Sequence, residues 1–173
     1  NGFYTNCVQK IEYHGGSLRL FATKKPKPSF LETEPLSEML NSELSHGIFN
    51  VSTYQDFMSQ ILSRRNRALN HIYDIKQKGG RIAAIGAAAR GNTILNFYNL
   101  DRSVVDFVTD VSPLKIGKFT PLTRIKIVPD DEFATGEEIY AIPLTDNLSS
   151  NLKKVLLELN PEIVFLEQFG LTR

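Results

Sequence analysis

Ile82-Ala83-Ala84-Ile85-Gly86-Ala87-Ala88-Ala89-Arg90-Gly91-Asn92-Thr93 is the stretch of sequence that decides the fold. Its first four residues are a continuous apolar run, which is typical of a strand buried on both faces. Small residues follow, and Asn92 or Thr93 can cap a short helix that carries Ile94 and Leu95. The stretch therefore predicts a strand, a tight loop and a helix, which together begin a parallel βαβ unit.

The residues that follow continue this alternation of strand and helix. Apolar runs predict further strands at 104–109, 125–128, 138–142 and 162–166, and the spacing of the leucines predicts an amphipathic helix at 147–159. Strands that alternate with helices imply a parallel sheet with right-handed crossovers. The predicted fold class is α/β, with residues 80–173 forming a Rossmann-like parallel sheet with flanking helices.

A strand and two helices are predicted before this sheet. The strand covers residues 16–23, and because it needs partners, we expect them in a domain upstream of this chain. The helices cover residues 32–46 and 53–78, with a capping-box pattern at Ser52 and a glycine stop at Gly79-Gly80. The longer helix is expected to pack on the sheet.

A lysine- and proline-containing segment marks a candidate domain boundary. Lys24-Lys25-Pro26-Lys27-Pro28 cannot continue the interior of a sheet and is typical of a linker. An exposed loop within one domain is the other interpretation. We place the boundary after residue 28, so that residues 1–28 belong to an upstream domain and residues 29–173 form the C-terminal domain.

Composition argues against several classes of function. The 20 basic and 19 acidic residues give a formal net charge of +1, so we expect no nucleic-acid partner. No apolar run approaches the ~18 residues of a membrane span. A single cysteine, Cys7, precludes an internal disulfide, and the three histidines lack the spacing of a zinc site. These features favour a cytoplasmic protein.

The loop after the first strand of the sheet is one candidate site. Open α/β sheets bind ligands at the carboxyl ends of their strands, and a helix amino terminus favours an anion. The loop matches neither GxGxxG nor a P-loop, and a tight turn whose small residues only permit close packing is the alternative. The candidate ligand contacts are Gly86, Ala87, Arg90, Gly91, Asn92 and Thr93.

A second candidate site begins where the next strand ends. Asp110 follows the first glycine by about the 20 residues at which an acidic residue contacts ribose in dinucleotide-binding folds. Lys115 and Lys118 could meet a phosphate as point charges. The alternative is a polar loop in which Asp110 caps Ser112 or Pro113.

A third candidate site is Glu12-Tyr13-His14-Gly15-Gly16. Two glycines beside an imidazole leave room for a substrate, and imidazole is suited to general-base catalysis near neutral pH. A histidine with a structural role, or one that is merely exposed, is the alternative.

Taken together and in their order along the chain, the three candidate segments resemble the sugar C-methyltransferases of deoxysugar biosynthesis. His14-Gly-Gly-Ser-Leu-Arg19 resembles the motif near the end of the family's S-adenosylmethionine domain. Residues 82–96 resemble its C-terminal Rossmann-like core, and residues 110–121 resemble its next motif. The resemblance covers residues 10–130. Arg90 stands where the family commonly has lysine, and Leu122 stands where it usually has glycine.

The resemblance implies that residues 1–28 are the tail of an S-adenosylmethionine domain and that a nucleotide-sugar substrate lies between that domain and the C-terminal one. It implies that His14 removes the proton beside a keto group, that Glu12 and Tyr13 assist, and that the S-adenosylmethionine cofactor is bound mainly upstream. Two other interpretations lack catalysis. One is a stand-alone nucleotide-binding module, and the other is a domain that self-associates through the helix at 53–78.

Overall fold

A parallel sheet forms the core of the C-terminal part of the chain, as the sequence predicts. The computed structural model describes residues 2–13, 16–25, 36–145 and 148–166, which form two compact units, 1–61 and 62–173. In the second unit, five parallel strands lie in the order β5-β4-β3-β6-β7. The α/β fold class is therefore confirmed. The strand bounds are Arg81–Ile85 for β3, Phe107–Thr109 for β4, Ile127–Val128 for β5, Ile139–Pro143 for β6 and Ile163–Phe165 for β7.

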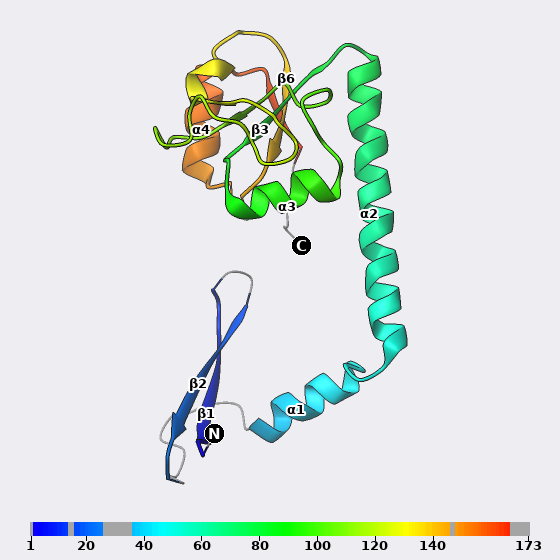
Figure 1. The fold of residues 1–173 in the computed structure, drawn as a ribbon, viewed down its shortest axis with the longest axis vertical. Helices are drawn as coiled ribbons and strands as arrows, with labels where there is room; N and C mark the ends of the chain where they lie inside the picture. Colours follow the sequence, from blue (N-terminus) through cyan, green and yellow to red (C-terminus); the bar gives the residue numbers. More distant parts are fainter. Residues whose placement is uncertain (1, 14–15, 26–35, 146–147, 167–173) are drawn as a thin grey trace. The chain divides into compact units, whose positions relative to one another are not determined.

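Helices cover both faces of this sheet (Figure 1). Helix α3 and the second half of α2 pack on the face to which Ala84 points, where Ile72 is fully buried. Helices η1 and α4 pack on the face to which Ala83 points, where Phe133 is fully buried. The apolar run at 82–85 is thus buried on both sides because its residues alternate between two cores. The helix bounds are Val51–Gln77 for α2, Ala89–Phe97 for α3, Asp130–Phe133 for η1 and Ser150–Leu159 for α4.

The first unit contains a hairpin and a helix. Strand β1 (Tyr4–Ile11) pairs antiparallel with β2 (Ser17–Thr23), and α1 spans Leu36–Ser45. The strand predicted at 16–23 is confirmed as β2. Its partner is β1 of the same chain, so the expectation that its partners lie outside the chain is wrong for this pairing. The boundary that we predicted after residue 28 falls outside the described residues.

The long helix begins and ends close to the predicted residues. It starts at Val51, so Ser52 lies in its first turn and the predicted capping box is wrong. After the helix, Gly79 adopts a φ of 80° and the Gly80 amide donates to the Ile75 carbonyl at 2.9 Å, which confirms the glycine stop. Across the described residues, no helix combines the length and the hydropathy needed to span a bilayer.

Helix α3 begins earlier than predicted, whereas α4 and β4 are shorter than predicted. Ala88 occupies the N-cap of α3, so neither Asn92 nor Thr93 caps that helix. Helix α4 starts at Ser150, because the Ser149 hydroxyl accepts the Leu152 amide at 3.1 Å and sets the first turn. Strand β4 starts only at Phe107, because residues 101–105 form a hydrogen-bonded turn in which the amides of 104 and 105 share the carbonyl of 101.

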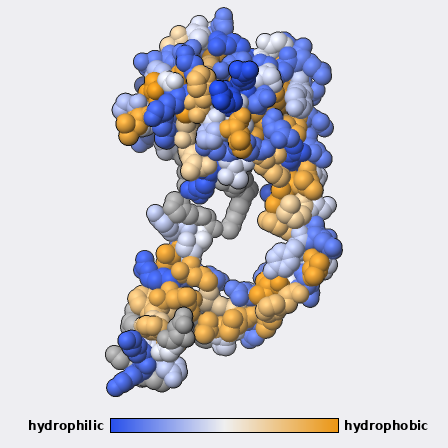
Figure 2. Space-filling view, in the orientation of Figure 1, coloured by the Kyte–Doolittle hydropathy of each residue, from blue (hydrophilic) through white to orange (hydrophobic). Residues whose placement is uncertain are grey.

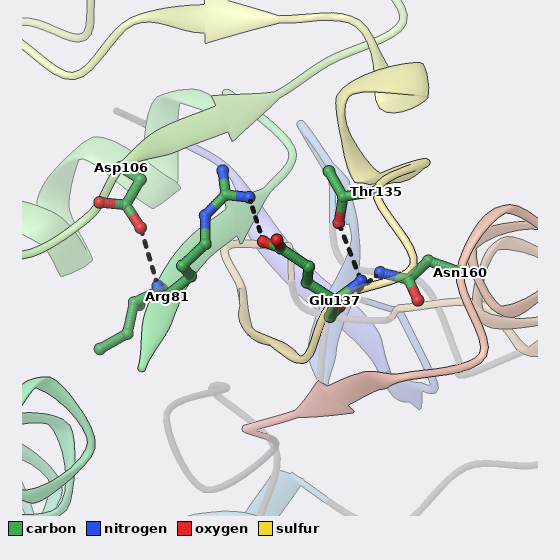
Figure 3. Close-up of polar contacts among 6 residues, drawn as sticks. Arg81, Asp106, Thr135, Glu137 and Asn160 are labelled. Carbon is green, nitrogen blue, oxygen red and sulfur yellow. Dashed lines mark hydrogen bonds and ion pairs between the residues drawn. The ribbon is translucent and has the colours of Figure 1, made fainter. Parts of the chain in front are cut away.

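Side-chain contacts tie together the loops at the amino-terminal edge of the sheet (Figure 3). Arg81 lies 3.4 Å from Glu137, and Asn160 donates to the Glu137 carbonyl at 2.8 Å. Asp106, just before β4, accepts the Ile82 amide at 3.1 Å. These contacts join the starts of four strands. They stabilise the edge opposite to the one at which ligands bind in such sheets.

The turn before β5 holds an exposed leucine in a backbone conformation that suits glycine. Leu122 has a φ of 65° and is 85% exposed. This conformation costs a non-glycine residue ~1–2 kcal/mol, and the added freedom of glycine in the unfolded chain offsets up to ~1 kcal/mol of the gain. We expect Leu122→Gly to raise the free energy of unfolding by about 0.5 kcal/mol in chemical denaturation. The control Leu157→Gly, on exposed α4 surface, should lower it by about 1 kcal/mol. A loss of stability in Leu122→Gly would show that the leucine makes an interaction worth more than its strain.

Candidate functional site

The carboxyl-terminal edge of the sheet brings the first two candidate segments together. The chain passes from β3 to β4 and β5 on one side and then places β6 and β7 on the other, so the strand order reverses beside β3. Ligands of open α/β sheets bind at such a reversal. The Gly86 amide, after β3, donates to the Thr109 carbonyl, at the end of β4, at 2.8 Å. The loops that follow these two strands are therefore neighbours.

Two glycines of the loop are explained by the chain that follows β6. Gly86 has a φ of 87°, and a Cβ added there would lie 2.7 Å from Thr145 Cγ2. A Cβ added at Gly91 would lie 2.7 Å from Leu144 Cβ. Real Cβ atoms do not approach other carbons so closely. Close packing thus accounts for both glycines, which is the structural alternative that the sequence left open.

The amino terminus of α3 is the part of the loop that is best placed for an anion. Ala88 is extended and, among the described residues, no side chain caps the helix, so its first-turn amides point to the edge of the sheet. Arg90 and Thr93 are exposed on the first turns, whereas Ala87 and Asn92 are half-buried. The Asn92 amide donates to the Ala88 carbonyl at 3.3 Å, so it serves the helix.

Asp110 is held by groups of its own protein. One carboxylate oxygen accepts the Ser112 amide at 2.9 Å, and the other lies 2.7 Å from Lys115 Nζ. The side chain is only 10% exposed. Burial raises the pKa of Asp110, but the Lys115 ammonium and the amides of Ser112 and Ala87 outweigh it and bring the pKa below its ordinary value. The carboxylate therefore joins the loops after β3 and β4, with little surface left for a ribose.

This arrangement has a consequence for acid stability. A depressed folded-state pKa stabilises the protein above the unfolded-state pKa of ~3.9, and this contribution is lost as the pH falls through the folded-state value. We expect Asp110→Asn to lower the free energy of unfolding by about 1 kcal/mol at pH 7, since Lys115 is partly exposed, and by much less near pH 3. Urea denaturation at both pH values measures the difference. The control Asp74→Asn removes an exposed carboxylate and should cost less than Asp110→Asn at pH 7. A loss for Asp110→Asn that is equal at both pH values would contradict the account.

Thr109 belongs to the same edge and was missed by the sequence analysis. It is completely buried at the end of β4, and its hydroxyl makes no hydrogen bond to any residue that the structure describes. Buried polar groups almost always have a partner, so this hydroxyl is unusual. It lies on the same side of the sheet as Phe107, two residues earlier. A threonine inside an apolar strand gives no sequence signal, because its partners are set by tertiary packing.

Lys118 does not pair with Asp110, whereas Lys115 does. It is exposed, and its carbonyl accepts the Ile127 amide at 2.8 Å, so its segment pairs with the start of β5. Within the described residues, no carboxylate forms an ion pair with its ammonium. The structure therefore groups the α3 amino terminus, Asp110 and Lys115, and it leaves Lys118 on the edge of the sheet.

The proposed catalytic segment lies in the first unit. Glu12 and Tyr13 are exposed after β1, and the Tyr13 carbonyl accepts the Gly16 amide and the Ser17 hydroxyl, both at 3.0 Å. His14 itself falls outside the described residues. Its role as a base stays a prediction.

Comparison with known proteins shows the family to which the chain belongs. The family model described as the C-methyltransferase C-terminal domain matches residues 12–160. The C-methyltransferase NovU of Streptomyces niveus is 29% identical over 164 residues, which is 94% of this chain and 37% of that protein. The chain thus spans little more than a third of the length of this curated relative. Because the family model covers most of the chain, this protein belongs to the C-methyltransferase C-terminal domain family.

Proposed function

We propose that this chain is the C-terminal, substrate-binding part of an S-adenosylmethionine-dependent C-methyltransferase that acts on a nucleotide-linked keto-deoxysugar. The family match over residues 12–160 carries the proposal. The geometry adds an uncapped helix amino terminus at the point where the strand order reverses, which is where an anionic ligand binds in such sheets.

The phosphates of the nucleotide-sugar are assigned to the edge formed by α3 and the loop after β4. The first turn of α3 offers backbone amides and the exposed Arg90. Lys115 is 42% exposed and uses one N–H for Asp110, so its other donors can point at a phosphate. In this proposal Asp110 holds Lys115 in place. Lys118 supplies a more distant charge.

His14 is proposed as the general base. It takes the α-proton next to the keto group, and the resulting enediolate carbon attacks an electrophilic methyl group in an SN2 step. Glu12 and Tyr13, which precede it in the chain, are proposed to orient the imidazole or the keto oxygen. S-adenosylmethionine would supply that methyl group from its sulfonium, whose methyl carbon–sulfur bond breaks as the sulfur leaves as a neutral thioether.

We place S-adenosylmethionine outside this chain. Among the described residues, the loop after β3 departs from a dinucleotide-type glycine motif, and its two glycines are occupied by contacts with Leu144 and Thr145. Residues 1–28 are proposed to be the tail of the domain that binds it. A two-stranded hairpin is marginal alone in water, so β1 and β2 fit the end of a larger sheet better than an independent domain.

A fusion protein tests the proposal. In it, this chain replaces the matching segment of the Streptomyces niveus C-methyltransferase. We expect transfer of a labelled methyl group from S-adenosylmethionine to a nucleotide-linked keto-deoxysugar. A fusion that folds and binds S-adenosylmethionine but transfers no methyl group to any such sugar would count against it.

The alternative is a nucleotide-binding module that acts alone. One observation favours it, since residues 62–173 form a compact unit with an apolar core on each face of the sheet. Tight dinucleotide binding by the isolated chain would support this alternative.

A further inference from the structure

We infer that the exposed apolar side chains of α1 and of the beginning of α2 form a docking surface. Its partner is the S-adenosylmethionine-binding domain of the methyltransferase, here called the donor domain. The inference rests on the proposed function. It concerns only the first unit, residues 1–61, and assigns a role to residues that the catalytic and substrate-binding proposals do not use.

Large apolar side chains are exposed at helical spacing in this unit. On α1 they recur every fourth residue, and on α2 they recur at intervals of three and four, so each helix presents one apolar stripe. Figure 2 shows such side chains gathered over α1 and the start of α2. The docking face consists of Leu36, Leu40, Leu44, Phe49, Val51, Tyr54, Phe57 and Met58.

The first unit buries too few apolar residues to stabilise these helices by itself. Its buried apolar residues among those described are Cys7, Val8 and Met39, and Met39 is the only buried residue of α1. A ten-residue helix is marginal in water unless one face is packed. Leu44 and Phe57 are 55% and 58% exposed, although both lie on the apolar stripes. The helices therefore need a surface that covers them.

The size of the docking face matches a stable protein interface. Half-exposed side chains of this kind each offer on the order of 100 Å² of apolar surface, so the face totals roughly 800 Å². That is about the area that each partner contributes to a standard interface, and it exceeds the patches of a few hundred Å² that monomers usually expose. A small-molecule ligand could not cover it.

The donor domain is a better occupant than a second copy of this chain. The same unit contains a two-stranded sheet, which requires further strands as well as apolar cover. A second copy brings the same short hairpin and helix face, whereas a methyltransferase domain brings a larger sheet. Most of the length of the Streptomyces niveus relative lies outside the matched segment, which leaves ample sequence for such a domain.

Hydrogen exchange of residues 36–45 tests the inference directly. In the isolated chain these amides should exchange rapidly at all protein concentrations. In the fusion with the Streptomyces niveus donor part they should exchange at least tenfold more slowly. The double variant Leu40→Glu/Phe57→Glu should abolish this protection. The matched variant Val155→Glu/Leu157→Glu, on the exposed surface of α4, should leave it unchanged.

Each outcome separates this inference from the proposed function. Equal exchange in the isolated chain and the fusion would overturn the docking surface, even if methyl transfer occurs. Protection that appears in the isolated chain as its concentration rises would also overturn it, because a second copy would then be the occupant. Protection in a fusion that transfers no methyl group would uphold the docking surface and reject the enzymatic proposal.

Discussion

Replacement of His14 by alanine in the fusion enzyme is expected to lower kcat by about 10²–10⁴-fold and to leave the unfolding temperature unchanged. The α-proton of the keto-sugar would lose its acceptor, so the carbanion that attacks the methyl group would form rarely. Nucleotide-sugar affinity should change little, because the phosphates are assigned to the sheet domain. Steady-state kinetics with labelled methyl donor, together with calorimetry, measures both quantities.

A second histidine serves as the control for this variant. His46 directly follows α1, where its Nδ1 lies 2.6 Å from the Ser42 carbonyl, so His46→Ala removes an imidazole other than the proposed base. It should retain wild-type kcat. Free imidazole in the buffer should restore part of the activity of His14→Ala. Wild-type turnover by His14→Ala would remove this residue from the mechanism.

Replacement of Gly86 by alanine is expected to lower the free energy of unfolding by about 2–5 kcal/mol. The φ of 87° costs an alanine ~1–2 kcal/mol. The added Cβ would lie 2.7 Å from Thr145 Cγ2, and relief of such a clash in packed surroundings costs a further ~1–3 kcal/mol. The same change would push apart the loops after β3 and β6, so the nucleotide affinity of the sheet domain should fall as well.

Two further variants separate the causes of this loss. Gly117 has a φ of 83° and no atom within 4 Å of an added Cβ, so Gly117→Ala should show the backbone cost alone. Thr145→Ser removes the clashing methyl group, so the double variant Gly86→Ala/Thr145→Ser should lose no more than Gly117→Ala. Chemical denaturation of the wild-type chain and of the three variants provides these values. Equal losses for Gly86→Ala and Gly117→Ala would show that the contact with Thr145 carries no energy.

The sheet could be predicted from the sequence because a strand that is buried on both faces consists of consecutive apolar residues. The run at 82–85 is uniformly apolar, and its residues alternate between two cores. The hairpin was harder to predict. In β1 the pairing register shifts between Thr5 and Cys7, and this irregularity places Cys7 and Val8 side by side as buried residues. The alternation of apolar and polar residues that would predict a strand is therefore lost.

Periodicity predicted the long helix but not what covers it. The apolar spacing runs through its whole length, yet its buried residues are Ala68, Ile72 and Ile75, all in the second half. The first half has the same pattern and exposes it. A sequence pattern reports that a face is apolar. It does not say whether the covering surface belongs to the same chain.

The candidate site, like the fold, could be predicted from the sequence only in part. That the loop and Asp110 meet at one edge follows from parallel strands and could be inferred in advance. The sequence offered a binding role and a structural role for each of these residues, but it could not decide between them. Gly86 and Gly91 are required by Thr145 and Leu144, which lie more than fifty residues later in the chain. The predicted alternative that Asp110 caps Ser112 is confirmed, whereas its contact with Lys115 was not predicted, because the loop after β4 brings that ammonium back to it.

The most direct test is a titration of the isotopically labelled chain with a nucleotide-linked deoxysugar, followed by NMR of the backbone amides. We expect saturable shifts at Ala89, Arg90 and Gly91 and at Lys115, and weaker binding of NAD. Shifts that saturate at other residues, or no shifts at millimolar ligand, would contradict the assignment of the substrate to this edge of the sheet.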